Sequence, residues 1–263
     1  MQGTTLLGWA IGATVAAGAL VDGWVRAPIV AGRWAAAIGS SPGADQARVL
    51  VREFRRRLII RRMGMIVGTL AMLAVQPQRH LGHLVNPVNG YVLGVLVAAR
   101  PHRAVSGARR LAAVQLRSVG TFVGHRAQRW LYVALVVAVA GQAVDVVLRP
   151  AGSLPVAIAW HLAVVAVPLL TAWSAERVAS LPVPAEDGAE LGLAWALRTS
   201  DVRALWGVAG YLALALPIFL AGWVVLLLLP FTFFAYGFLV SGLRPPTVRQ
   251  RQRLRSVAEI GVV

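Results

Sequence analysis

Residues 205–240 form a run of 36 consecutive positions without a single Asp, Glu, Lys or Arg. A helix needs about 20 apolar residues to cross a bilayer core of about 30 Å, because it rises about 1.5 Å per residue. The run is too long for one crossing, so we expect it to turn back near Ala221-Gly222. Pro217 and Pro230 would kink the two helices, which membrane helices tolerate. The run therefore predicts a chain whose solvent is largely hydrocarbon.

Seven segments reach or approach the length of a membrane span. They are predicted at 4–25, 63–77, 86–99, 130–148, 154–173, 204–221 and 223–242. The composition agrees, because 58% of the residues are hydrophobic and only 14% are charged, whereas about a quarter of a soluble domain is charged. The second and third segments are short and need neighbouring residues such as 58–60, or a thinner bilayer. We predict an all-α fold, a single polytopic transmembrane helical bundle with about seven spans, or six if residues 4–25 lie at the interface.

The basic residues give the orientation. All 26 residues that are Lys or Arg are Arg, and cytoplasmic connections are enriched in such residues. Four predicted cytoplasmic segments hold 24 of them: 26–62, 100–129, 174–203 and 243–263. The absence of lysine is typical of a GC-rich bacterial genome. We therefore predict a chain with its N-terminus outside and its C-terminus inside a bacterial cytoplasmic (inner) membrane. Trp130, Trp173 and Trp206 fall at predicted cytoplasmic ends, where indole rings prefer the headgroup region.

The first inner segment reads as a basic amphipathic helix. Ser41 and Pro42 resemble an N-cap and a first helical residue, and Asp45 lies in the first turn. The apolar face comprises Ala47, Leu50, Val51, Phe54 and Leu58, and the basic face Arg48, Arg52, Arg55 and Arg56. Residues 104–123 are predicted to form a second such helix. Helices of this type lie on anionic membrane surfaces. The predicted lipid or partner surface comprises Arg55, Arg56, Arg57, Arg61, Arg62, Arg109 and Arg110.

Two inner segments carry opposite charge. Residues 100–129 have a net charge of +7 and residues 174–203 of −2, so the two either dock or form separate solvated surfaces. Two stretches begin in these segments and end in or just beyond them: Leu116-Arg117-Ser118 with Trp130, and Ala196-Leu197-Arg198-Thr199-Ser200-Asp201-Val202-Arg203-Ala204-Leu205. With these stretches the chain resembles, over residues 50–255, a group of uncharacterised actinobacterial polytopic membrane proteins. The resemblance implies a location and a topology, and it implies no activity and no functional residue.

The candidate intramembrane polar residues are Asp145, His161 and Gln142. An ionisable side chain within a membrane span is costly and is a functional hypothesis by default. The tight connection at 149–153 makes the spans of Asp145 and His161 antiparallel neighbours, so the two side chains could relay protons. The alternative is that Asp145 pairs with Arg149 and that His161 satisfies a neighbouring backbone group.

The other motifs read as structural. Asp22 and Arg26 have the spacing of an ion pair within one helix. Three GxxxG pairs in different spans allow close helix packing: Gly8 with Gly12, Gly64 with Gly68, and Gly90 with Gly94. His80 and His83 read as part of a solvated connection, so no metal site is expected. We expect no cofactor either, because no Gly-rich nucleotide motif is present.

Three function classes remain open. A permease-like transport subunit for a small solute, ion or lipid is favoured by the intramembrane Asp145 and His161 and by the kinking prolines. A hairpin-and-inner-helix plan, which either recurs along the chain or matches by chance, would favour it as well. Its partner would be a separate ATPase or another membrane subunit. A non-catalytic anchor or assembly subunit that binds a partner through the Arg-rich inner face is the alternative. A lipid-modifying enzyme is the third class. We predict no enzyme, because clustered carboxylates are lacking, and no nucleic-acid partner, because no binding module accompanies the basic runs.

Overall fold

The computed structural model describes residues 2–38, 43–75, 87–99, 118–148, 154–181, 188–220 and 235–239. Within these ranges the backbone is almost entirely helical and contains no strand. The predicted all-α fold is thus confirmed for this part of the chain. The chain divides into two compact units, Met1–His102 and Arg103–Val263, and each is described by itself.

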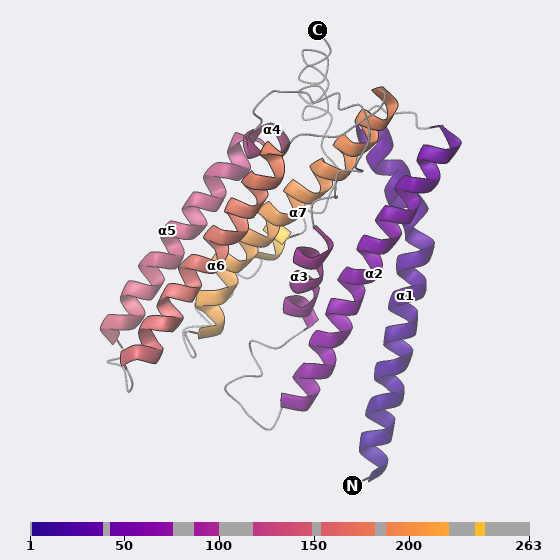
Figure 1. The fold of residues 1–263 in the computed structure, drawn as a ribbon. Coiled ribbons are helices and arrows are strands. Elements are labelled where there is room, and N and C mark those ends of the chain that lie inside the picture. The colour runs from indigo at the N-terminus through magenta and orange to yellow at the C-terminus, as the bar shows by residue number, and fades with distance from the viewer. Residues whose placement is uncertain are drawn as a thin grey trace. The chain divides into compact units, whose positions relative to one another are not determined.

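The first unit consists of α1 (Gln2–Ile38), α2 (Ala44–Val75) and α3 (Pro87–Ala98). Helix α2 packs against both α1 and α3 (Figure 1). Helix α1 contains Pro28 and runs without interruption through the expected inner boundary at residue 26. Helix α2 joins the basic segment and the second apolar segment in one continuous helix. The additional residues that the short second segment needs, 58–60, therefore lie in the same helix.

Helix α2 begins two residues later than the Ser-Pro signal predicts. The carbonyl oxygen of Gly43 accepts a hydrogen bond from Ala47 N at 2.8 Å. Gly43 N donates to Gln46 Oε1 at 3.2 Å, which is the return contact of a capping box. Gly43 is thus the N-cap, while Ser41 and Pro42 lie outside the described residues. Asp45 lies in the first turn as expected.

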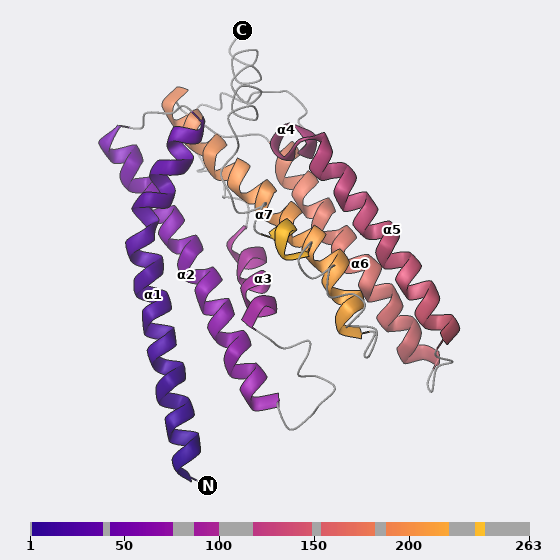
Figure 2. The ribbon, with the colours of Figure 1, turned by 180° about the vertical axis from the view of Figure 1, so that it is seen from behind.

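The second unit contains α4 (Val119–Val123), α5 (His125–Leu148), α6 (Leu154–Ser180) and α7 (Gly188–Leu220). Helix α7 contacts α4, α5 and α6, and Figure 2 shows it beside α5 and α6 from the opposite side. Every residue from 199 to 215 is buried. Helix α7 is therefore the core helix of this unit. The predicted turn near Ala221-Gly222 and Pro230 lie outside the described residues.

The predicted amphipathic helix over 104–123 is contradicted at Ser118, whereas residues 119–123 are helical as predicted. Ser118 has extended backbone angles, and α4 begins only at Val119. The helix ends at Gly124, which has a φ of 86°, a conformation that favours glycine because other side chains would clash there. A second helix, α5, starts directly afterwards. Residues 104–117 of the predicted helix lie outside the described residues.

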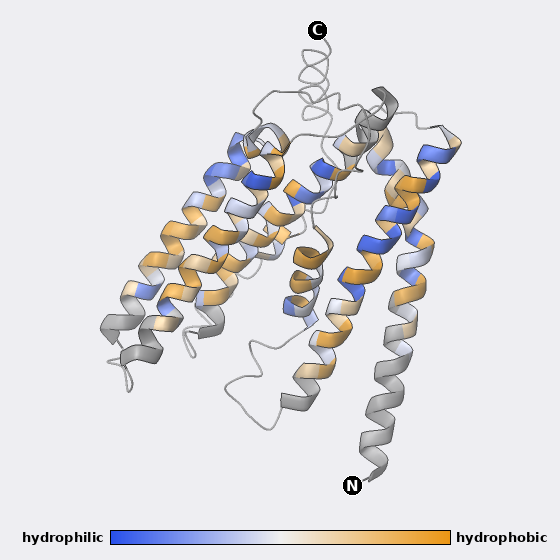
Figure 3. Ribbon diagram, viewed as in Figure 1, coloured by the Kyte–Doolittle hydropathy of each residue, from blue (hydrophilic) through white to orange (hydrophobic). Residues whose placement is uncertain are grey.

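Hydropathy is distributed unevenly along the second unit. Figure 3 shows hydrophilic residues gathered at the end of α5, α6 and α7 that lies near α4, with hydrophobic residues along most of the remaining described length. Among the side chains that the structure describes, one helical stretch, His161–Ser180, has the length and apolarity of a membrane span. Only a third of this stretch is buried, whereas the core helix of a soluble protein is mostly buried. Helix α3 is apolar but shorter.

Candidate functional site

The structure pairs two of the three predicted polar residues. Gln142 is buried on α5, and its Oε1 atom contacts Nδ1 of His161 on α6. If Oε1 is the acceptor, Nδ1 carries the proton and Nε2 is the acceptor of the ring. The partner of His161 is thus a side chain and not the backbone group of the alternative interpretation. Asp145 lies on α5, but its side chain and Arg149 are outside the described residues.

The pair also fixes the alignment of α5 and α6. Trp130 lies twelve residues before Gln142, and Trp173 lies twelve residues after His161. Because the two helices are antiparallel neighbours, both tryptophans lie at the same level. Trp206 of α7 reaches this end as well, because its Nε1 donates to the carbonyl oxygen of Ala127 at 3.3 Å. The three tryptophans that the sequence places at cytoplasmic ends are therefore together at one end of the unit.

The predicted ion pair between Asp22 and Arg26 is confirmed, and Asp22 also has a second arginine partner. Asp22 Oδ1 lies 2.5 Å from Arg26 Nε on the same helix. Asp22 Oδ2 accepts a hydrogen bond at 2.7 Å from Nη2 of Arg62, which the sequence assigned to the lipid or partner surface. One carboxylate thus links α1 to α2. Beside it, the guanidinium carbon of Arg55 lies 3.6 Å from the centroid of the Trp24 ring.

Two predicted surface residues are in fact buried. The side chain of Arg57 is 1% exposed and Arg61 is 6% exposed. They continue the line of Leu50 and Phe54 at helical spacing, and both of these are buried. The helical period therefore turns Arg57 and Arg61 into the packed side of α2, where a run of adjacent arginines cannot all face outward. Glu53 compensates Arg57, with a distance of 3.4 Å between Oε1 and Nε.

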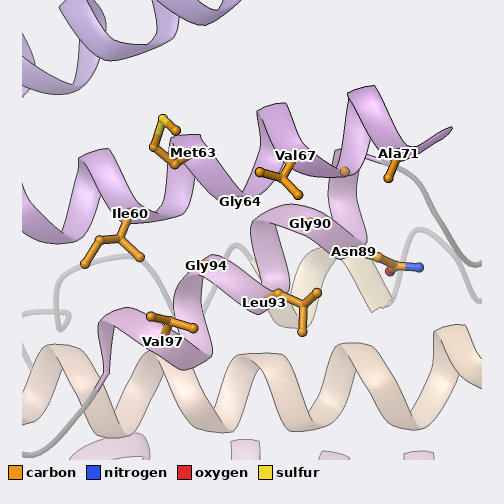
Figure 4. A pocket seen from close by; sticks show the side chains of 11 residues that line it. Ile60, Met63, Gly64, Val67, Ala71, Asn89, Gly90, Leu93, Gly94 and Val97 are labelled. Carbon is orange, nitrogen blue, oxygen red and sulfur yellow. The ribbon is translucent and has the colours of Figure 1, made fainter. Parts of the chain in front are cut away.

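The GxxxG motifs of α2 and α3 pair with one another. Figure 4 shows Gly64 of α2 and Gly90 and Gly94 of α3 between the two helices. A Cβ atom added at Gly90 would overlap the carbonyl oxygen of Gly64 and lie 2.8 Å from Gly68 Cα. The glycines therefore serve contact within the chain. Beside them lies an open groove of about 370 Å³, which is lined by apolar side chains and Asn89. The side-chain surroundings of Gly8 and Gly12 are outside the described residues.

The two oppositely charged segments, 100–129 and 174–203, do dock in their described parts, through contacts that the sequence reasoning did not identify. Val119 N at the start of α4 donates to Glu176 Oε2 of α6 at 3.1 Å. Nη1 of Arg203 donates to the carbonyl oxygen of Phe122 at 3.5 Å. The Phe122 ring stacks on Trp195 of α7, with 5.4 Å between the ring centroids. Charged side chains thus bind backbone groups, and net charge alone could not have specified which ones.

The buried part of α7 at this end is polar. Thr199, Ser200, Asp201 and Arg203 are all buried, and Thr199 Oγ1 donates to the carbonyl oxygen of Trp195 at 2.7 Å. Burial lowers the pKa of the Arg203 guanidinium to about 10. Arg203 therefore keeps its charge at neutral pH. All four residues belong to the 196–205 stretch that carries the family resemblance, and this stretch was the sequence feature from which the buried polar cluster could have been identified.

Several predicted features lie outside the described residues, namely Arg109, Arg110, His80 and His83. Among the described side chains, no group of three or more His, Asp or Glu residues could hold a metal ion. No family model, curated protein or solved structure matches the chain.

Proposed function

We propose that the chain is a multi-pass protein of the bacterial cytoplasmic membrane with its N-terminus outside and its C-terminus inside. The observation that supports this is the distribution of apolar side chains over α5 and α6. Large residues such as Val136, Leu162 and Leu170 are exposed, whereas the buried stripe of α5 contains the small residues Ala134 and Ala138. Water-soluble proteins rarely expose so extensive an apolar face.

The hydroxyl groups support the same location. Thr69, Thr171, Ser174 and Thr199 each donate to the carbonyl oxygen four residues earlier, at 2.7–2.9 Å. A hydroxyl bonded in this way needs no water partner. From Trp130 to the end of α5 at Leu148 the helix rises about 27 Å at about 1.5 Å per residue, close to the thickness of a bilayer core.

The location can be tested with single cysteines, because the chain contains none of its own. Arg48→Cys lies in the predicted inner segment and Ala151→Cys in a predicted outer connection. A membrane-impermeant maleimide should label Ala151→Cys in intact cells and Arg48→Cys only after lysis. Labelling of both variants in intact cells, or recovery of the chain in the soluble fraction, contradicts the proposal.

Within this class we propose a permease-like transport subunit for a small solute, an ion or a lipid, working with a separate ATPase or another membrane subunit. The observation that carries this is the side-chain pair of Gln142 and His161, which lies among apolar residues of two neighbouring helices. A histidine held by an amide keeps a second ring nitrogen for a proton or a polar solute.

Proton entry into vesicles loaded with the pH-sensitive dye pyranine tests this function. The wild-type chain should admit protons under an imposed gradient, and His161→Leu and Asp145→Asn should lower the rate at least tenfold. His125→Gln, which changes an exposed histidine at the start of α5, is the matched control. Equal rates for wild type and empty vesicles would remove the proton-linked version of the proposal.

The second candidate is a non-catalytic anchor, favoured by the exposed arginines of α2. Arg48, Arg52 and Arg56 are all exposed, so this helix presents a basic surface for a partner. Gentle detergent extraction should then recover a stoichiometric partner, and Arg52→Glu with Arg56→Glu should release it. Recovery of the chain alone would exclude a stable complex.

A further inference from the structure

We propose that α1 and α2 form a binding site for the phosphate headgroup of an anionic phospholipid, centred on Arg52, Arg55 and Trp24. The inference rests on the proposed membrane location and on contacts within the first unit. It narrows a general basic surface to one site and assigns a role to Arg52, which the sequence reasoning placed only on the basic face of the helix.

The arginines of α2 differ in how far acidic residues compensate them. Three arginines have a carboxylate oxygen close to a guanidinium nitrogen. The distance is 3.2 Å from Arg48 Nη1 to Asp45 Oδ1, 2.6 Å from Arg56 Nη2 to Glu53 Oε1, and 2.7 Å from Arg62 Nη2 to Asp22 Oδ2. Arg52 and Arg55 form no ion pair with any residue that the structure describes. Arg52 and Arg55 thus each keep a positive charge that no described carboxylate contacts.

Their arrangement suits a phosphate. Arg52 and Arg55 are three residues apart and so lie on neighbouring positions of the same helix side. The Arg55 guanidinium stacks on Trp24 with 3.6 Å between its central carbon and the ring centroid. A stacked guanidinium is held in place by its face and keeps N–H donors at its edge for phosphate oxygens. Trp24 thus orients Arg55, and Arg52 supplies a second cation.

The apolar surface beside these cations selects a lipid over a free anion. Trp24 is 55% exposed, and Val21 and Val25 on the same helix are 62% and 59% exposed. Acyl chains lying along this part of α1 would cover these side chains while the headgroup reaches Arg52 and Arg55. A soluble phosphate has no group that can cover them. The chemistry therefore fits a phospholipid with a net negative headgroup, such as phosphatidylglycerol.

Native mass spectrometry of the detergent-purified chain tests the site, with equal amounts of phosphatidylglycerol and phosphatidylcholine added. The wild type should retain phosphatidylglycerol preferentially. Arg52→Gln and Arg55→Gln should each lower that preference by about fivefold, since a juxtamembrane arginine contributes about 1 kcal/mol to anionic-lipid binding. Trp24→Ala should act in the same direction, and Trp24→Phe should restore part of the preference because an aromatic ring remains for stacking.

Arg48→Gln is the matched control, because it removes the same charge from the same helix at a residue already paired with Asp45. If Arg48→Gln lowered the preference for phosphatidylglycerol as much as Arg52→Gln does, lipid binding would depend only on overall charge, and the proposed site would be overturned. Equal retention of the two lipids by the wild type would also overturn it, as would complete competition by excess inorganic phosphate. Each variant is compared at unchanged helix content by circular dichroism.

Failure of the membrane proposal gives a different result. In that case the wild type would not float with phosphatidylcholine vesicles in a density gradient. A chain that floats but shows no preference between the two lipids would refute the headgroup site alone.

Discussion

The Nε1 atom of Trp206 donates a hydrogen bond to the carbonyl oxygen of Ala127 at 3.3 Å and so links α7 to the first turn of α5. A carbonyl in the first turn of a helix already accepts one bond within the helix and has a second lone pair for the indole. Trp206 is buried, whereas Trp130 and Trp173 at the same end are 57% and 58% exposed. One of the three tryptophans therefore has a packing role that the other two lack.

Trp206→Phe should lower the free energy of unfolding by about 1–3 kcal/mol, because it removes the hydrogen bond and leaves a gap where the larger ring was. Thermal unfolding in detergent measures the change. Trp173→Phe is the control. The Trp173 ring is exposed, and its centroid lies 5.5 Å from the guanidinium carbon of Arg177. This substitution should change the free energy of unfolding by less than about 0.5 kcal/mol. Equal effects of the two substitutions would contradict a packing role for Trp206.

Glu176→Ala should release the start of α4. The Glu176 carboxylate is the acceptor for Val119 N, one of the amides at a helix start that have no partner within the helix. Hydrogen exchange at residues 119–123 should become at least tenfold faster, which corresponds to about 1.4 kcal/mol of lost protection. Glu176→Gln retains an acceptor oxygen, so its exchange rate at residues 119–123 should lie between those of the wild type and of Glu176→Ala. Unchanged exchange in the Ala variant would show that Phe122 and Arg203 hold α4 without Glu176.

The sequence predicted the helical class, the ion pair of Asp22 and Arg26, and the adjacency of the helices that carry Gln142 and His161. These features depend on periodicity and on short spacings, which a single sequence displays directly. It also predicted that Leu50 and Phe54 would form an apolar face, and both are buried.

The features that the sequence did not predict depend on partners far away in the chain. Arg57 and Arg61 read as surface residues because a run of arginines beside an apolar segment usually is one, yet the helical turn directs them inward. The contact between Asp22 and Arg62 spans 40 residues, and the bond from Arg203 to Phe122 spans 81. Neither spacing has a local signature, because tertiary packing alone decides which acceptor an arginine meets.

Gly90→Ala should separate α2 from α3. A methyl group at this position overlaps the backbone of Gly64, and backbone cannot move aside as a flexible side chain can. We expect the free energy of unfolding, measured by thermal unfolding in detergent, to fall by about 1–3 kcal/mol, the usual cost of overpacking. Gly141→Ala is the control, because a Cβ atom there has no neighbour within 4 Å and alanine gains up to about 1 kcal/mol of helix propensity. A Gly90→Ala variant as stable as wild type would mean that the two helices do not pack closely.

Asp22→Asn should weaken the contact between α1 and α2 by about 1 kcal/mol. The substitution keeps the size of the side chain and removes the charge that attracts Arg26 and Arg62. The Asp22 and Arg62 side chains are less than one-third exposed, so solvent screens them less than a surface pair. Asp45→Asn, which affects an almost fully exposed pair, should cost little. Urea unfolding measures both variants, and similar losses would assign the effect to charge alone.

A double-mutant cycle with Gln142→Leu and His161→Leu should give a positive coupling energy. Gln142→Leu leaves the half-buried His161 without its partner, and His161→Leu leaves the buried Gln142 without its partner. The double variant removes both groups together, so its loss of unfolding free energy should be smaller than the sum of the two single losses. Polar pairs between membrane helices typically couple by about 0.6 kcal/mol and by at most about 1.7 kcal/mol. Reversible unfolding in mixed micelles supplies the four free energies. Strictly additive losses would show that the contact between Gln142 and His161 contributes nothing to stability.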